Sequence, residues 1–246
     1  ILKQAEAAGV ESAWIVDHIA IPPDEAEGSG GRYLDPLTSL AWMAGQTQSI
    51  LIGTSVLILP YRPKLPTAKA IATIQELSGE RLLLGVGIGW MDPEFQALGV
   101  DRHRRGRLSD ETLAFLHECF DNDIVTANDQ RFLFKPRPAR PPIYIGGSAP
   151  HAIDRALKYG DGWLPMGHLD KIAPQIRQYH ERSEASQGKP GEVVTFATLP
   201  EGDVDRAREM ISRYSAAGVT RIIIGRTYES AKDWAPTFEL LSALNS

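Results

Sequence analysis

The chain has 246 residues, of which 43% are hydrophobic and 23% charged, and its formal net charge is −5. This length and composition predict a globular chain with a buried core. The acidic balance argues against nucleic acid as a partner, and no apolar run reaches the roughly 18 residues that a membrane span requires. The single cysteine, Cys119, excludes an internal disulfide and a cysteine-rich metal cage. We therefore expect a reducing, cytoplasmic location, no membrane contact and no metal site.

Short apolar runs alternate with helical patterns along the chain. The first helical pattern, residues 1–8, ends at Gly9, which suits the position just past a helix end. The expected strands are residues 12–16, 50–59, 82–88, 142–145, 162–165, 193–199 and 219–224. The expected helices after the first are residues 36–48, 65–77, 107–120, 149–159, 171–186, 204–217 and 230–244.

Apolar strands separated by helices predict an α/β fold with parallel pairing, either a closed (β/α)₈ TIM barrel or an open doubly wound sheet. The seven strands favour the barrel if one further strand precedes Ile1. We therefore expect the first barrel strand to be absent from this sequence and the native protein to be longer at its N-terminus.

Three connecting segments are longer than ordinary βα loops, so we expect one domain over residues 1–246 with insertions at about 19–35, 90–106 and 121–140. Residues 19–35 are rich in proline, glycine and acidic residues and predict a lid. Residues 90–106 carry a basic cluster, which is either a solvated helix face or a site that binds the anionic tail of a cofactor or substrate. Residues 121–140 predict a small hairpin.

His18 is the main candidate for proton transfer. It follows Asp17 at the end of the first strand-like run, and the carboxyl ends of barrel strands form the active site in this architecture. An imidazole at this place is suited to acid or base catalysis near neutral pH. The alternative is a histidine that only forms a hydrogen bond with a loop backbone.

Glycines at two other strand ends predict contacts with a ligand. Residues 146–148, Gly-Gly-Ser, lie between a strand and a helix, with Ser148 as the expected N-cap and Pro150 in the first turn. Main-chain N–H groups at such a helix start form a phosphate cradle, although an ordinary glycine turn is the alternative. Residues 85–90 do not fit a dinucleotide-binding motif, because Trp90 stands in the sixth position and no helix is expected directly after it. Glycines there keep the strand end low enough for a flat ring to lie across it.

Several of these segments together resemble one family. They are residues 5–18, 53–57, 77–90, 142–148 and 159–163, and the match spans about residues 5–166. Their order and spacing are similar to those of the bacterial luciferase-like monooxygenase superfamily, in the branch that uses the deazaflavin coenzyme F420.

This resemblance implies a TIM barrel that holds a flavin or deazaflavin at its carboxyl end. On that analogy Ser55 and Val56 form a strand-end bulge against the ring, often with a cis peptide bond, and His18 lies near the reactive edge. Glu94 is implied as a second catalytic candidate that offers a hydrogen bond in the pocket. The residues expected to bind the cofactor are Asp17, Ser55, Val56, Gly87, Gly146, Gly147 and Ser148.

The leading functional expectation is F420-dependent hydride transfer to or from a small organic substrate. One alternative keeps the fold but uses FMN and oxygen as a monooxygenase, and another is a non-catalytic cofactor-binding barrel. A sugar-phosphate aldolase or isomerase would need a strand-end lysine or paired carboxylates, and neither is evident in these strands. The resemblance also implies a possible homodimer.

Overall fold

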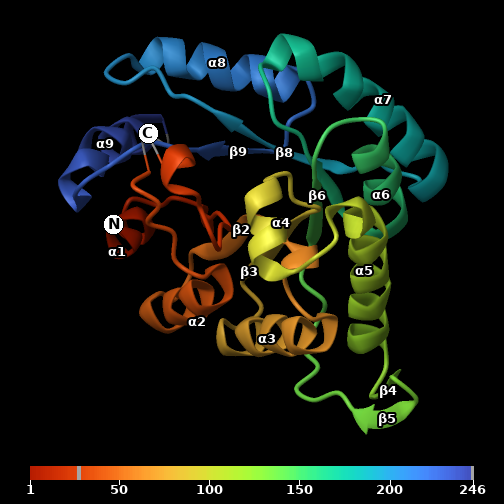
Figure 1. Ribbon diagram of the computed structural model, residues 1–246. Helices are drawn as coiled ribbons and strands as arrows, with labels where there is room; N and C mark the ends of the chain where they lie inside the picture. The colour runs from red at the N-terminus through yellow and green to blue at the C-terminus, as the bar shows by residue number, and fades with distance from the viewer. Residues whose placement is uncertain (27–28, 245–246) are drawn as a thin grey trace. The chain divides into compact units, whose positions relative to one another are not determined.

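A computed structural model describes residues 1–26 and 29–244 of the chain (Figure 1). The chain divides into two compact units. The first, called the N-terminal unit here, comprises residues 14–143, and the C-terminal unit comprises residues 1–13 and 144–246. Strand β1 (Ser12–Ile15) crosses the boundary between them.

The N-terminal unit has two parallel strands covered by helices. Strands β2 and β3 pair in parallel, and helix α3 packs against both α2 and α5. All six residues of β3 are buried, as expected for a strand covered on both faces. The elements are η1 (Pro23–Glu25), α2 (Pro36–Gln46), β2 (Leu51–Ile58), η2 (Leu59–Tyr61), α3 (Lys64–Leu77), β3 (Leu82–Gly87), α4 (Asp92–Leu98), η3 (Arg102–Arg104), α5 (Arg105–Asp121), β4 (Ile124–Ala127) and β5 (Gln130–Leu133).

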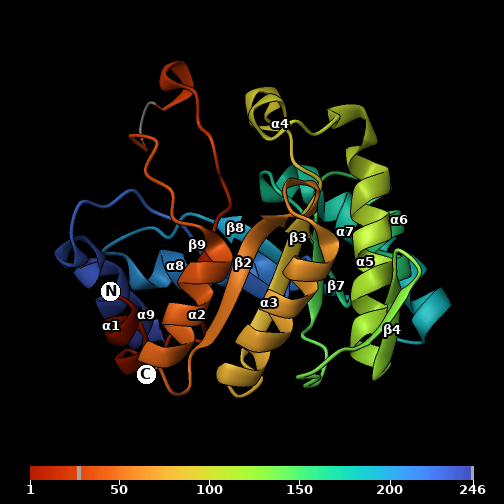
Figure 2. The same cartoon turned by 60° about the horizontal axis from the view of Figure 1, so that its bottom comes forward.

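Two of the predicted insertions contain regular structure. Strands β4 and β5 form the expected antiparallel hairpin. Residues 90–106, expected as a long loop, instead contain helix α4 and the turn η3. Pro93 in the first turn of α4 and the left-handed Gly99 at its end, with φ +66°, bound this helix. Figure 2 shows α4 and the segment before α2 at the same end of β2 and β3, where these strands end.

The C-terminal unit contains a run of parallel strands. Strand β6 pairs with β7, β7 with β8, and β8 with β9. Its largest fully buried side chains include Trp163, Tyr144 and Tyr179. The elements are α1 (Leu2–Ala7), β6 (Ile143–Gly146), α6 (His151–Tyr159), β7 (Gly162–Leu164), α7 (Leu169–Gln187), β8 (Glu192–Ala197), α8 (Val204–Ala216), β9 (Arg221–Ile224), η4 (Ala231–Trp234) and α9 (Ala235–Leu244).

The last predicted helix, residues 230–244, is divided into η4 and α9. Ser230 accepts a hydrogen bond from Lys232, and the carboxylate of Asp233 accepts bonds from the main-chain N–H groups of Glu229 and Ser230. This capping box fixes the start of the segment. Among the described residues, no helix combines the length and the apolar character needed to cross a membrane.

Candidate functional site

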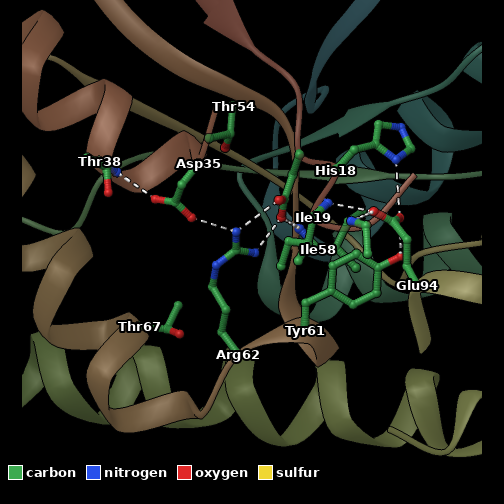
Figure 3. Close-up of polar contacts among 12 residues, drawn as sticks. His18, Ile19, Asp35, Thr38, Thr54, Ile58, Tyr61, Arg62, Thr67 and Glu94 are labelled. Atoms are coloured by element: carbon green, nitrogen blue, oxygen red, sulfur yellow. Dashed lines mark hydrogen bonds and ion pairs between the residues drawn. The ribbon is translucent and has the colours of Figure 1, made fainter. Parts of the chain in front are cut away.

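His18 and Glu94 meet in the N-terminal unit, although 76 positions separate them in the sequence. His18 follows β1, and Glu94 lies in the first turn of α4. The His18 Nδ1 atom lies 3.1 Å from Glu94 Oε2, and the side chain of His18 is 20% exposed whereas that of Glu94 is 1% exposed (Figure 3). The structure thus brings together the two predicted catalytic residues and leaves one of them accessible.

The carboxylate of Glu94 accepts hydrogen bonds at both oxygens. The main-chain N–H groups of Ile19 and Ala20 donate to Oε1, and the Tyr61 hydroxyl donates to Oε2 at 2.8 Å. Burial favours the neutral acid, but these donors and His18 outweigh it and lower the pKa of Glu94 below its ordinary value. An ionised Glu94 can only accept hydrogen bonds, so Nδ1 of His18 carries the shared proton. In neutral His18 the Nε2 atom then keeps its lone pair.

Asp17 is held by a second buried network. Its carboxylate accepts a hydrogen bond from the N–H of Ile58 at 2.8 Å and two from the guanidinium of Arg62. The same guanidinium bonds Asp35 at 2.9 Å, the N-cap residue of α2. Burial of Arg62 opposes its charge, but Asp17 and Asp35 outweigh this and raise its pKa. Figure 3 shows the bond between Arg62 and Asp35. Arg62 therefore ties the end of β1 to the start of α2.

Strand β2 carries the expected bulge. The peptide bond between Ser55 and Val56 is cis, and the pairing with β3 shifts register between Thr54 and Leu57. Both bulge residues are partly exposed. A Cβ atom placed on Gly87 would lie 2.5 Å from Cγ2 of Val56, so glycine is needed for the bulge to lie this close to β3.

Several apolar residues close to His18 in the sequence or in space have exposed side chains. Val16 is 39% exposed, Ile19 43% and Trp90 64%. The ring of Tyr33 lies 4.7 Å from the His18 ring, and that of Trp90 lies 6.3 Å from it, measured between centroids. Exposed apolar groups gathered at one place are typical of a ligand-binding surface.

The predicted phosphate cradle lies in the C-terminal unit, after β6. Gly147 has φ +126°, a conformation that side-chain-bearing residues rarely adopt, and both Gly147 and Ser148 are exposed. The expected N-cap is wrong: α6 begins at His151 with Pro150 as its N-cap residue, and no side-chain capping bond is present. The main-chain carbonyl of Ser148 instead accepts a hydrogen bond from Ala152. The main-chain N–H of Gly147 donates to the carbonyl of Leu164 at 3.3 Å.

Two other sequence features have structural roles. Arg102 pairs with Asp92, and Arg107 with Glu111. Cys119 is fully buried on α5, and burial raises the pKa of its thiol to about 12. The thiol is therefore a packing group, because its reactive thiolate form is suppressed near neutral pH. Within the described residues, no group of three or more potential metal ligands was found.

Comparison with known proteins identifies the family. The sequence profile described as luciferase-like monooxygenase matches residues 1–243. The chain belongs to the luciferase-like monooxygenase family. A relative named F420-dependent glucose-6-phosphate dehydrogenase, from Amycolatopsis mediterranei, is 28% identical over 84% of this chain and 66% of its own length.

Solved structures agree on the fold. The oxygenating constituent of 3,6-diketocamphane monooxygenase from Pseudomonas putida, in complex with FMN, matches with a TM-score of 0.80 at 14% identity, over 98% of this chain and 88% of that one. An F420-dependent secondary alcohol dehydrogenase matches with a TM-score of 0.77 at 14% identity, over 100% and 94%. The predicted α/β fold of the luciferase-like TIM-barrel type is confirmed, and the chain is an oxidoreductase of this family.

Sequence reasoning missed Tyr61 and Arg62. Both follow β2 directly, at the strand end where functional groups are expected, and this position was the available signal. Their partners are 33 and 45 positions away in the sequence, so their roles become visible only in the fold.

Proposed function

We propose that this chain is an F420-dependent oxidoreductase that moves a hydride to or from a small organic substrate, with His18 as the proton acceptor or donor. The observation that carries the proposal is the buried carboxylate of Glu94, 3.1 Å from Nδ1 of the accessible His18. This pairing directs the basic Nε2 atom away from Glu94, where a substrate hydroxyl can reach it. We further propose that residues 1–246 act as one catalytic domain.

The proton chemistry follows from the His18–Glu94 pair. In the oxidation of an alcohol, a C–H bond breaks and its two electrons leave with the hydride, while the O–H proton passes to Nε2 and a carbonyl forms. The resulting imidazolium is stabilised by the adjacent carboxylate of Glu94. In the reverse direction, protonated His18 donates from Nε2 to the carbonyl oxygen.

Each unit by itself offers residues that suit one part of a deazaflavin or flavin. Bound in this family's manner, such a ring supplies the two-electron acceptor or donor. The bulge at Ser55 and Val56, with Gly87 below it, offers a partly exposed surface on which a ring can lie. We propose that a phosphate binds beside residues 146–148, at the exposed Ser148, because the main-chain N–H of Gly147 already donates to Leu164. The A. mediterranei relative, whose name states F420 dependence, supports the choice of deazaflavin.

Asp17 acts in this proposal as a positioning residue. Both of its carboxylate oxygens accept hydrogen bonds from Ile58 or Arg62, so it holds the segment after β1 on which His18 lies. Glu94 acts in a similar way on His18. The apolar surface around His18 favours a substrate with an apolar body beside its reacting carbon.

The first experiment is a fluorescence titration of the protein with oxidised F420 and, separately, with FMN. Binding of F420, followed by anaerobic bleaching of its absorbance on addition of alcohols, is the expected result. Binding of FMN alone, with substrate-dependent oxygen uptake, would favour the monooxygenase alternative. Binding of neither cofactor would contradict both assignments.

His18→Ala then tests the proton role. We expect F420 affinity to change by less than about threefold, while turnover falls by about 10²–10⁴-fold, the range for loss of general acid–base catalysis. His117→Gln on α5 is the matched control and is expected to retain activity. Full activity of His18→Ala would refute the assignment of His18.

A further inference from the structure

Tyr61 and His18 both contact the same carboxylate oxygen, Oε2 of Glu94. Its hydroxyl donates to Glu94 Oε2 at 2.8 Å, and Nδ1 of His18 lies 3.1 Å from the same atom. The ring of Tyr61 is buried, 7% exposed, and packs edge-on against Phe95 at 5.1 Å between centroids. Phe95 follows Glu94 in α4, so the tyrosine is fixed against the helix that carries the carboxylate.

The Tyr61 hydroxyl is protonated near neutral pH and donates its hydrogen bond to Glu94. Burial and the hydrogen bond to Glu94 both raise the pKa of Tyr61 far above its ordinary value. The main-chain N–H groups of Ile19 and Ala20 donate to Oε1 of Glu94, whereas Oε2 is the oxygen that His18 contacts. Tyr61 donates to that same oxygen.

Three charged residues near this network, Asp17, Arg62 and Asp35, are paired with one another. The Asp17 carboxylate, adjacent to His18 in the chain, bonds Arg62, and Arg62 also bonds Asp35. The rings that face His18, those of Tyr33 and Trp90, carry no charge that responds to Tyr61. The Glu94 carboxylate is therefore the group through which Tyr61 can influence His18.

We propose that Tyr61 is a positioning residue that sets the proton affinity of His18 by competing with it for Oε2 of Glu94. The tyrosine makes His18 a weaker base and a stronger acid than the Glu94 carboxylate alone would make it. The catalytic meaning of this proposal rests on the proposed function, but the effect on His18 does not.

The test is an NMR titration of the His18 ring in the full chain without cofactor. Tyr61→Phe keeps the ring against Phe95 and removes only the hydroxyl. The midpoint of the His18 titration is expected to move to higher pH by about half a unit to one unit, a fraction of one charge-assisted hydrogen bond. Glu94→Gln is expected to move it to lower pH. The double variant should behave as Glu94→Gln does, because Tyr61 then has no carboxylate to act through.

Tyr179→Phe, which removes a buried hydroxyl in the C-terminal unit, is the matched control and should leave the midpoint unchanged. An unchanged or lowered midpoint in Tyr61→Phe would overturn the proposal. A second measurement uses the unaltered protein and covers the case in which this variant does not fold. The ¹³Cζ resonance of Tyr61 should move with the same midpoint as His18, and a resonance that ignores the His18 titration would also overturn the proposal.

Activity of the F420-loaded protein gives a readout that purely structural damage would not produce. In Tyr61→Phe the acidic limb of kcat/KM should move to higher pH by the same amount as the His18 midpoint, with the plateau retained. A uniform loss at every pH would contradict the proposal. If neither cofactor supports turnover, the proposed function fails, while the titration of His18 still decides the role of Tyr61.

Discussion

The buried bond between Asp17 and Arg62 holds the strand end that carries His18, and its removal should cost stability. The side chain of Asp17 is fully buried and that of Arg62 is 13% exposed. In Asp17→Asn the size is unchanged, but the charge is lost and the new amide NH₂ group confronts the donors of Arg62 and Ile58.

The size of this effect can be worked from the geometry. Breaking a buried ion pair costs about 3–5 kcal/mol. Asp35 still bonds Arg62 in the variant, so the lower end, about 3 kcal/mol, is expected. For a chain of this size that loss lowers Tm by about 6–12 °C. Asp35→Asn removes a carboxylate that is 46% exposed from the same guanidinium and should cost about 0–1 kcal/mol.

The assay is thermal and urea unfolding of both variants and the unaltered chain at pH 7, followed by circular dichroism. The two variants remove the same charge from the same arginine and differ mainly in burial. Equal losses of stability would refute this prediction, because burial would then have no influence on the free energy that each ion pair contributes to folding.

Three further predictions concern other parts of the N-terminal unit. The pKa of Glu94 lies below its ordinary value of 4.5, so its ionisation stabilises the fold above pH 4.5, and this contribution is lost as the pH falls through the pKa of the folded state. The difference in urea midpoint between the unaltered chain and Glu94→Gln should therefore shrink on acidification from pH 7 to pH 4. A constant difference would contradict this prediction. Gly53→Ala should lower the free energy of unfolding by about 1–3 kcal/mol, since the new Cβ would lie 2.7 Å from the Trp14 ring. The new Cβ of Gly45→Ala meets nothing within 4 Å, so this control should be neutral or stabilising. Equal urea midpoints for the two variants would contradict this account of packing. Cys119 should react with a thiol reagent only after unfolding, and rapid labelling of the native protein would show that the thiol is accessible.

Local patterns were sufficient to predict most of the fold. The apolar runs that became β2 and β3, and the hairpin of β4 and β5, were placed within a few residues of their observed bounds. Helix α4 was missed because its seven residues are too few for a clear period, although Pro93 and Gly99 mark its two ends. The capping role expected of Ser148 failed because the helix starts three residues later.

The candidate site was predicted only in part, for a physical reason. His18 was placed by its position after a strand, which is a local property. The contacts of Glu94 with Tyr61 and His18 join residues 33 and 76 positions apart, and no local pattern encodes such pairings. Sequence reasoning could therefore name His18 and Glu94 as candidates without predicting the bond between them.

The segment between His18 and α2 is fastened at both ends by side chains that lie outside it. Glu94 holds the N–H groups of Ile19 and Ala20 at its start, and Arg62 holds Asp35 at its end. For a loop anchored in this way, each doubling of length adds only about 0.6 kcal/mol of closure entropy. Insertions between the anchors that keep the Tyr33 ring on His18 should therefore cost little stability and leave His18 in place. The protein could thus acquire new substrate preferences by changing this loop while its proton chemistry stays the same.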